Sequence, residues 1–268
     1  MEDPRVDLEL DRAHSARMYD YYLGGTTNFP ADREAVGRVL AAFPQALIAA
    51  RSNRAFMHRA TRYLAEHGLH QFLDVGTGIP TKPNLHEIAQ SVEPRARILY
   101  VDNDPIVLAH AQALLLSTPE GRTAYMQADL ADAAAILEAK VLHENLDLTQ
   151  PVALSLNAVL HFIPDHDVAY RIVETFKEAL PLGSALVASH ATADFAPLVQ
   201  GVANVYKSVG TSAKVRTREE FTRFFDGWDL VDPGVTVTHR WRPDQDTVAS
   251  AITDAEASCY GAVARKIA

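Results

Sequence analysis

The sequence predicts an α/β fold in which a doubly wound, mostly parallel sheet carries helices on both faces. Three observations predict it. Short apolar runs alternate with helical patterns, a glycine turn follows the first of those runs, and no repeat or linker divides the chain. With 268 residues, of which 48% are hydrophobic, the chain can bury one large core. We therefore expect a single domain spanning residues 1–268.

The first quarter of the chain is predicted to be helical after a tail that runs to about Asp11. Apolar residues recur there at intervals of three and four, as one face of a helix requires. Gly24-Gly25 and Pro44 interrupt the pattern, because glycine reaches backbone angles that other residues avoid and proline cannot continue a helix. We expect helices over residues 13–23, 32–43 and 44–66.

The middle of the chain alternates strand with helix. Strands are expected over residues 71–75, 97–101, 123–127, 152–157 and 184–189, and helices over 84–91, 105–116, 131–142 and 165–180. This alternation predicts parallel βαβ units, in which ligands bind beyond the carboxyl ends of the strands. Farther on, a capping box at Thr217 and Glu220 predicts a helix through Phe225. Two final strands are expected over residues 230–237 and 260–266.

Charge and cysteine content exclude several classes of protein. The chain carries 34 acidic and 25 basic side chains, a net charge of -9 that would repel a nucleic acid. The nearest approach to a basic stripe, Arg51, Arg54, Arg59 and Arg62, is interpreted as solvated helix positions. A single cysteine, Cys259, excludes an intrachain disulfide and suits the cytoplasm. We expect a cytoplasmic protein with no secretory signal, no membrane span, no metal and no nucleic-acid partner.

A glycine turn ends the first predicted strand, in the segment Phe72-Leu-Asp-Val-Gly-Thr-Gly-Ile-Pro80. Glycines at its centre allow a tight turn and a close approach of the backbone to a ligand. A G-x-G alone is a weak signal, but its place between a strand and a helix favours a nucleoside site. The candidate cofactor-binding residues in this loop are Asp74, Gly76, Thr77 and Gly78.

Acidic residues end the next two strands. Asp102 follows about 24 residues after Gly78, close to the spacing of a carboxylate that binds both ribose hydroxyls. Asp129 could accept a hydrogen bond from an adenine amino group, could cap a helix, or could do both. With their neighbours Asn103 and Leu130, these two residues are the candidates for the nucleoside end of a cofactor.

The loop favours S-adenosylmethionine over a dinucleotide. A dinucleotide fingerprint has a third glycine at the position of Thr81, where it lets a helix present its N-terminus to a pyrophosphate. A P-loop is excluded because the chain has no Gly-Lys-Ser/Thr sequence. S-adenosylmethionine has no phosphate and does not need the third glycine. An NAD-dependent oxidoreductase remains the alternative.

Five segments carry a family resemblance. They are Ala16–Gly25 with Asn28-Phe29-Pro30, Phe72–Pro80, Val101–Pro105, Leu160–Pro164 and Ser189–Asp194. In these segments the chain resembles the class I methyltransferases and, more narrowly, a bacterial S-adenosyl methyltransferase family long classed as of unknown function. The resemblance implies a Rossmann-like, seven-stranded sheet with a reversed last strand and cofactor binding through Gly76, Gly78, Asp102 and Asp129. It also implies an N-terminal helical lid over residues 1–68, ahead of an α/β core over 69–268.

Aromatic and basic side chains in the first helix suggest further cofactor contacts. Tyr19 and Tyr22 share one face of the helix and are predicted to cover the cofactor. Arg17 is the candidate partner for the cofactor's carboxylate. The alternative is that both tyrosines are core aromatics whose hydroxyls reach the surface.

Two histidines fall at the predicted ligand end of the sheet. His161 lies just past the fourth strand, after Asn157, and an imidazole there suits a general base. His161 and Tyr22 are the candidate catalytic residues, and Asn157 is a candidate cofactor contact. His190 occupies the equivalent end of the fifth strand. Either histidine could instead be a satisfied structural residue.

The segment 194–216 is long for a connection and contains few charges. With the N-terminal helices, it is predicted to form the pocket for a small organic methyl acceptor. We therefore predict an S-adenosylmethionine-dependent methyltransferase acting on a small molecule, with oxygen or nitrogen as the methylated atom. A non-catalytic S-adenosylmethionine-binding sensor or partner protein is the alternative in another class, and a homodimer is left open.

Overall fold

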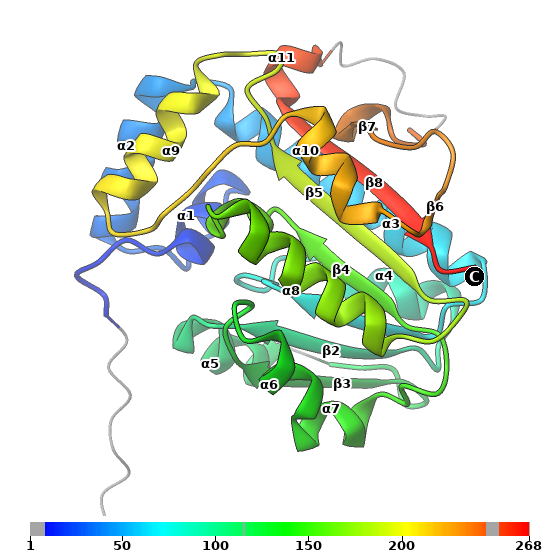
Figure 1. The fold of residues 1–268 in the computed structure, drawn as a ribbon. Helices are drawn as coiled ribbons and strands as arrows, with labels where there is room; N and C mark the ends of the chain where they lie inside the picture. The colour runs from blue at the N-terminus through cyan, green and yellow to red at the C-terminus, as the bar shows by residue number, and fades with distance from the viewer. Residues whose placement is uncertain (1–8, 115, 245–251, 268) are drawn as a thin grey trace, which may run out of the picture.

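A central sheet organises the computed structural model, which describes residues 9–114, 116–244 and 252–267 (Figure 1). Its strands lie in the order β3-β2-β1-β4-β5-β8-β6, and β7 also pairs with β8. β1 to β5 are mutually parallel, whereas β8 runs antiparallel to β5. This confirms the predicted doubly wound sheet with a reversed last strand. The strands are β1 (Gln71–Val75), β2 (Arg97–Asp102), β3 (Arg122–Gln127), β4 (Ala153–Asn157), β5 (Ala185–Ala191), β6 (Asp229–Leu230), β7 (Thr236–Val237) and β8 (Cys259–Arg265).

Helices cover both faces of the sheet and its ligand end (Figure 1). Most of the predicted helix positions hold to within a few residues, as is usual for helix ends. Residue 115, in the helix predicted over 105–116, lies outside the described residues. The helices are α1 (Ser15–Tyr22), α2 (Pro30–Ala42), α3 (Ala46–Glu66), α4 (Leu85–Val92), α5 (Pro105–Leu114), α6 (Ala133–Glu138), α7 (Lys140–Asn145), α8 (His166–Ala179), α9 (Val199–Ser208), α10 (Arg218–Thr222) and α11 (Asp254–Ala257). Three short 3-10 turns are η1 (Leu160–Phe162), η2 (Arg223–Phe225) and η3 (Thr238–Arg240).

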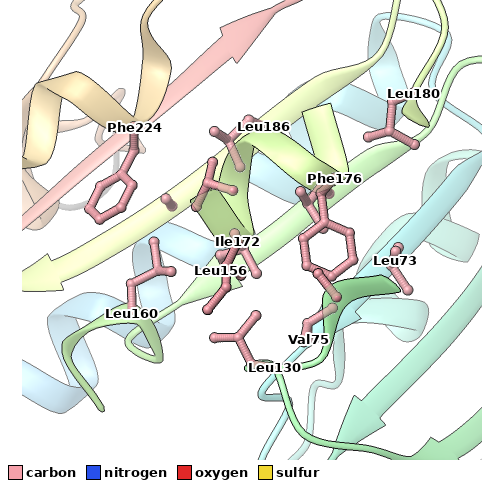
Figure 2. Close-up of a cluster of buried hydrophobic side chains, with 14 of the residues drawn as sticks. Leu73, Val75, Leu130, Leu156, Leu160, Ile172, Phe176, Leu180, Leu186 and Phe224 are labelled. Atoms are coloured by element: carbon pink, nitrogen blue, oxygen red, sulfur yellow. The ribbon is translucent and has the colours of Figure 1, made fainter. Parts of the chain in front are cut away.

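Successive residues of β1 point into two different cores, because side chains alternate across a strand. Leu73 and Val75 pack on the face covered by α8, where Figure 2 shows Phe176 directed at them. Phe72 packs on the opposite face, against α3 and α4. Burial on both faces explains why the central strands are almost continuously apolar.

Helix α3 and strand β8 approach each other closely on the second face. A Cβ at Gly261 of β8 would lie only 2.9 Å from the Phe56 ring of α3, so the strand can approach the helix this closely because the residue is glycine. Phe56 in turn meets Trp241 edge to face, at 5.5 Å between ring centroids. These contacts fix α3 beneath the sheet and place its first turns at the ligand end.

Two of the elements predicted from the sequence are each divided into two in the structure. The predicted strand over residues 230–237 forms β6 and β7, separated by a turn in which Gly234 adopts a φ of +75° and its N–H bonds the Val231 carbonyl at 2.8 Å. Pro233 lacks the N–H that a continuous strand would use. The described residues therefore form eight strands rather than seven. The helix predicted over 131–142 is divided into α6 and α7 by an extended Ala139, and no proline or glycine marks that break.

A layer of helices lies beyond the carboxyl ends of the parallel strands. Figure 1 shows α1, α2 and α9 gathered there, with α9 beside α2. α9 falls inside the segment predicted as a long connection. Its buried residues Val199, Ala203 and Tyr206 follow helical spacing, and Val199 and Tyr206 belong to the core that includes α2. No helix in the described ranges is long and apolar enough to cross a membrane.

Candidate functional site

A cavity of about 500 Å³ lies between the ends of the strands and this helical layer. Sites for small ligands commonly fall between roughly 300 and 1,000 Å³. The structure brings almost all of the predicted site residues to its wall: Tyr19, Tyr22, Asp74, Gly76, Thr77, Gly78, Asp102, Asn103, Asp129, Leu130, Asn157 and His161. Arg17 is the exception.

The loop after β1 makes the tight turn that its two glycines predict. Gly76 has a φ of +75° and Gly78 a φ of +70°, a conformation that side chains disfavour. A Cβ at Gly76 would also overlap Val159, whose own Cβ would be 2.7 Å away. The loop backbone therefore borders the cavity with no side chain at either position.

Asp102 joins this loop to the end of β2. Its carboxylate is only 6% exposed and accepts hydrogen bonds from the Gly78 N–H at 2.8 Å and the Asp104 N–H at 3.0 Å. Burial raises the pKa of Asp102 above its ordinary value, while the two N–H donors oppose that rise. The carboxylate is thus held in one orientation at the cavity wall.

A second carboxylate, Asp74, ends in the same space from β1. The Ser155 hydroxyl donates to Asp74 at 2.6 Å, and the Asn157 side-chain amide donates to that hydroxyl at 2.7 Å. Burial raises the pKa of Asp74, partly offset by the hydrogen bonds from Ser155 and Thr77. The side-chain oxygen of Asn157, Oδ1, is buried without a hydrogen-bond partner. A buried acceptor of this kind is rare in folded proteins, and one that lines a cavity can be satisfied by a ligand.

Asp129 lies at the far end of the cavity. One of its oxygens accepts the Ala131 N–H at 2.8 Å, and the other faces the Asn103 amide at 3.4 Å. Asp129 does not cap a helix. The N-cap of α6 is Asp132, whose side chain accepts the Ala135 N–H at 3.0 Å.

Arg17 points away from the cavity, contrary to the expectation that it meets the cofactor's carboxylate. Its guanidinium is 2% exposed and lies 3.2 Å from an Asp104 oxygen and 3.9 Å from an Asp32 oxygen. The His14 ring is 3.1 Å from the same Asp104 carboxylate. Two buried carboxylates hold Arg17, because a buried charge needs an opposite charge beside it. The ion pair between Arg17 and Asp104 joins α1 to the residues that follow β2.

Unlike Arg17, Arg54 of α3 reaches the cavity. It lines the cavity and donates to the carbonyls of Thr81 and Pro83, while its Nε is buried without a hydrogen-bond partner. Interpreting the arginines of α3 as solvated was therefore wrong for Arg54. It was also wrong for Arg59, which is 9% exposed and donates to the Trp241 and Thr238 carbonyls.

Three tyrosine side chains line the cavity from the helical side. Tyr19 donates to the Ala50 carbonyl at 3.1 Å and accepts the Asn53 amide at 2.9 Å. The hydroxyls of Tyr22 and Tyr206 are 3.5 Å apart. Burial raises the pKa of Tyr19 to about 12 and that of Tyr22 well above its ordinary value. Both are neutral phenols near neutral pH, and neither can serve there as a base.

The two predicted histidines differ in their partners. His190 is fully buried, and both of its ring nitrogens are bonded, one to the Ala191 carbonyl and the other to Arg216, each at 2.8 Å. His190 therefore fits the second alternative given above, a structural residue whose hydrogen bonds are satisfied. His161 lines the cavity with Nδ1 buried and unpartnered. Desolvation and the nearby Arg216 lower the pKa of His161 to about 3, so its ring is neutral.

Sequence reasoning missed several residues of the cavity wall. Beside Arg54 these include His14, Asn53 and Cys259, whereas Tyr206 lies in the segment predicted to form the acceptor pocket. Helical spacing is the sequence signal that could have identified Asn53 and Arg54. Asn53 and Arg54 lie one turn after Ala49 and Ala50, which also line the cavity. Nothing local marks Cys259 at the start of β8, because its position depends on how the sheet is ordered.

The whole chain matches one family of proteins. A family model described as S-adenosyl methyltransferase matches residues 1–267. A solved DUF574 family protein from Streptomyces avermitilis is 51% identical, with a TM-score of 0.94 over 97% of this chain and 100% of that chain. A candidate methyltransferase from Thermobifida fusca is 36% identical, with a TM-score of 0.91 over 100% of both chains.

More distant structures share only the fold. Human N-acetylserotonin methyltransferase, solved in complex with S-adenosylmethionine, is 17% identical, with a TM-score of 0.52 over 96% of this chain and 63% of that chain. Comparison with curated proteins found no match. The family match over residues 1–267 and the 51% and 36% identities show that the chain belongs to the S-adenosyl methyltransferase family, enzymes whose cofactor is S-adenosylmethionine.

Proposed function

We propose that this chain methylates an oxygen or nitrogen atom of a small organic molecule inside the cavity described above. One observation carries the proposal: a single cavity joins the charged loops at the strand ends to the apolar helices α1, α2 and α9. The first part has the groups that a charged nucleoside cofactor requires. The second part offers an acceptor a space that is shielded from water.

The cavity wall fits the cofactor in three respects. The loop at Gly76 and Gly78 brings its backbone to the cavity wall, with open space where a Cβ at Gly78 would stand. Asp102 presents a fixed carboxylate for the ribose hydroxyls, and Asp129 with Leu130 would border the adenine. Asp74 would pair with the ammonium of the amino-acid end, and Arg54, through its unpartnered guanidinium edge, with the carboxylate of that end.

A dinucleotide fits the same loop poorly. The helix after the loop begins only at Leu85, and its N-cap residue Asn84 is occupied by Glu87, which accepts the Asn84 N–H at 2.6 Å. A pyrophosphate at the loop would therefore meet no free helix N-terminus. This supports methyl transfer over the oxidoreductase alternative.

When bound, S-adenosylmethionine supplies a methyl group on a sulfonium sulfur, which keeps the bonding electron pair and becomes a neutral thioether as the methyl carbon bonds to the acceptor. Positioning and exclusion of water account for much of the acceleration in such a displacement. The neutral ring of His161 would accept a hydrogen bond from the acceptor's O–H or N–H, orienting its lone pair. Because the pKa of His161 is about 3, the ring would hold the acceptor's proton only transiently and would release it to solvent when the product leaves.

The N-terminal helices and residues 194–216 complete the proposed site. We assign residues 1–68 as a lid over the α/β core of residues 69–268, all within one domain. Tyr22 from α1 and Tyr206 from α9 contribute to the same wall, which supports that assignment. As neutral phenols, they would position the acceptor and not deprotonate it.

Ligand-induced stabilisation tests the proposal. Unfolding temperatures are measured with S-adenosylhomocysteine, with NAD and without ligand. We expect a shift with S-adenosylhomocysteine alone. A shift with NAD alone would overturn the proposal. Transfer of a labelled methyl group from S-adenosylmethionine to phenols and amines then separates an enzyme from a non-catalytic binder.

A further inference from the structure

The two parts of the cavity differ sharply in charge. Among the described residues of its wall, the arginine and carboxylate side chains are Arg54, Asp74, Asp102 and Asp129, and each comes from the strand ends, the loops after them, or α3 beside them. The helical part, which we call the acceptor compartment, is lined by Tyr22, Val39, Phe43, Phe162, Val202 and Tyr206. None of these six side chains carries a charge near neutral pH.

The polar groups of the acceptor compartment are largely satisfied by one another. Tyr22 and Tyr206 pair with each other, and Tyr19 is bonded to both Ala50 and Asn53. Burial raises the pKa of Tyr206 to about 12, so this phenol also remains neutral. A charged group placed here would lose its water and gain no counter-charge, which is strongly unfavourable.

Unsatisfied hydrogen-bonding capacity is concentrated where the compartment meets the strand ends. The side-chain Oδ1 of Asn157 and the Nδ1 of His161 are both buried without hydrogen-bond partners. The His161 ring contacts Phe162 at 4.3 Å between centroids, and Phe162 contacts Tyr206 at 5.3 Å. The His161 ring therefore adjoins the aromatic wall. It lines the cavity and offers a hydrogen-bond contact for a polar group of the acceptor.

We infer that the methyl acceptor is an uncharged, largely apolar molecule of aromatic shape, with one hydroxyl or neutral aromatic amine directed at His161. The inference rests on the proposed function and extends it to a class of substrate. Carboxylated, phosphorylated or cationic acceptors are disfavoured, since the compartment has no side chain to pair with them. Edge-to-face packing on Phe162 and Tyr206 favours a flat ring over an aliphatic chain of the same size.

Binding of matched probes tests this inference. Calorimetry on the full chain, saturated with S-adenosylhomocysteine, measures the affinity of 2-naphthol, 6-hydroxy-2-naphthoate and 6-(aminomethyl)-2-naphthol. We expect 2-naphthol to bind at least tenfold more tightly than either charged analogue. Equal affinities, tighter binding of a charged analogue, or no binding of 2-naphthol would overturn the inference. Failure to bind S-adenosylhomocysteine would instead overturn the proposed function.

A charge placed in the compartment gives a second, independent readout. Val202 lines the compartment from α9 and is only partly buried, so Val202→Lys is compatible with folding. We expect this variant to lose tenfold or more in 2-naphthol affinity and to gain affinity for 6-hydroxy-2-naphthoate, with S-adenosylhomocysteine affinity within twofold. Asn204→Lys, an exposed position on the same helix, is the matched control and should leave all three affinities unchanged. Identical behaviour of the two variants would contradict the assigned compartment.

Discussion

The hydroxyls of Tyr22 and Tyr206 lie 3.5 Å apart, although 184 residues separate them along the chain. One belongs to α1 and the other to α9, so the contact joins the N-terminal helices to the segment inserted after β5. The cavity wall is therefore assembled from both ends of the chain. Variants that probe the site must be chosen so that loss of a ligand contact is distinguished from loss of this assembly.

Asp102→Ala should weaken S-adenosylhomocysteine binding by one to two orders of magnitude. The loss is on the order of 1.5–3 kcal/mol, the value of a hydrogen bond to a charged group. Asp102→Asn should lose less, because the amide oxygen can still accept one hydrogen bond. Calorimetry measures both. An unchanged dissociation constant for the alanine variant would remove Asp102 from the cofactor site.

Arg54→Met should lower S-adenosylhomocysteine affinity about tenfold, which corresponds to about 1.4 kcal/mol, with little change in stability. Arg54 faces the cavity and its hydrogen-bond partners are backbone carbonyls, while the nearby buried Asp74 keeps its hydrogen bond from Ser155 when Arg54 is removed. Arg51→Met, at an exposed position on the same helix, is the matched control. Equal affinity in the two variants would exclude Arg54 as a cofactor contact.

Arg17→Met should lower stability and leave S-adenosylhomocysteine affinity nearly unchanged, the opposite of what is expected for Arg54→Met. Removing this guanidinium leaves Asp104 and Asp32 buried without their counter-charge, which is expected to destabilise the fold by roughly 3–5 kcal/mol. Denaturant unfolding measures that loss. Protein that remains folded should bind S-adenosylhomocysteine within a few-fold of wild type. A large loss of affinity at unchanged stability would restore Arg17 to the cofactor site.

Gly76→Ala should destabilise the protein by roughly 2–4 kcal/mol, since it combines a positive φ with overlap on Val159. Gly78→Ala has a similar φ but nothing within 4 Å of the added Cβ, so it should lose only about 1–2 kcal/mol. The double variant Gly76→Ala/Val159→Ala should recover part of the larger loss. Equal effects at the two glycines would show that the overlap does not matter.

Acid should destabilise the protein partly through His161. Its pKa is about 3 in the folded chain and near 6.5 when unfolded, so between those values the unfolded state binds the extra proton. The free energy of unfolding therefore rises with pH from 3 to 6.5, by up to about 1.4 kcal/mol per pH unit from this residue. His161→Gln should flatten the profile in that window. The exposed His143→Gln is the control, and superimposable profiles for the two variants would contradict the assignment.

The sheet could be predicted from the sequence because its evidence is local. Apolar runs, capping residues and the glycine turn each occupy a few consecutive positions, and together they placed β1 to β5 and the loop at Gly76. The break at Ala139 and the division of residues 230–237 were missed. The break at Ala139 has no local marker, whereas Pro233 and Gly234 do mark the division of residues 230–237 and were not used.

The charged partners in the site were harder to predict. The sequence marks Arg17 and Arg54 equally as arginines on amphipathic helices, and which one faces the cavity depends on the rotation of each helix against the sheet. Asp104 and Asp32 fix Arg17, and neither pairing is visible before α1 and α2 are placed. The carboxylates could be predicted because they follow strands, whose ends meet at one edge.

Strand β8 lies between β5 and β6 although it follows both along the chain. Until it is synthesised, β5 presents a row of unpaired backbone N–H and C=O groups on a strand that is otherwise buried. A chain growing on the ribosome therefore has an open, apolar edge that can pair with other chains. We expect nascent or truncated forms that lack β8 to depend on chaperones, whereas the finished chain covers that edge itself.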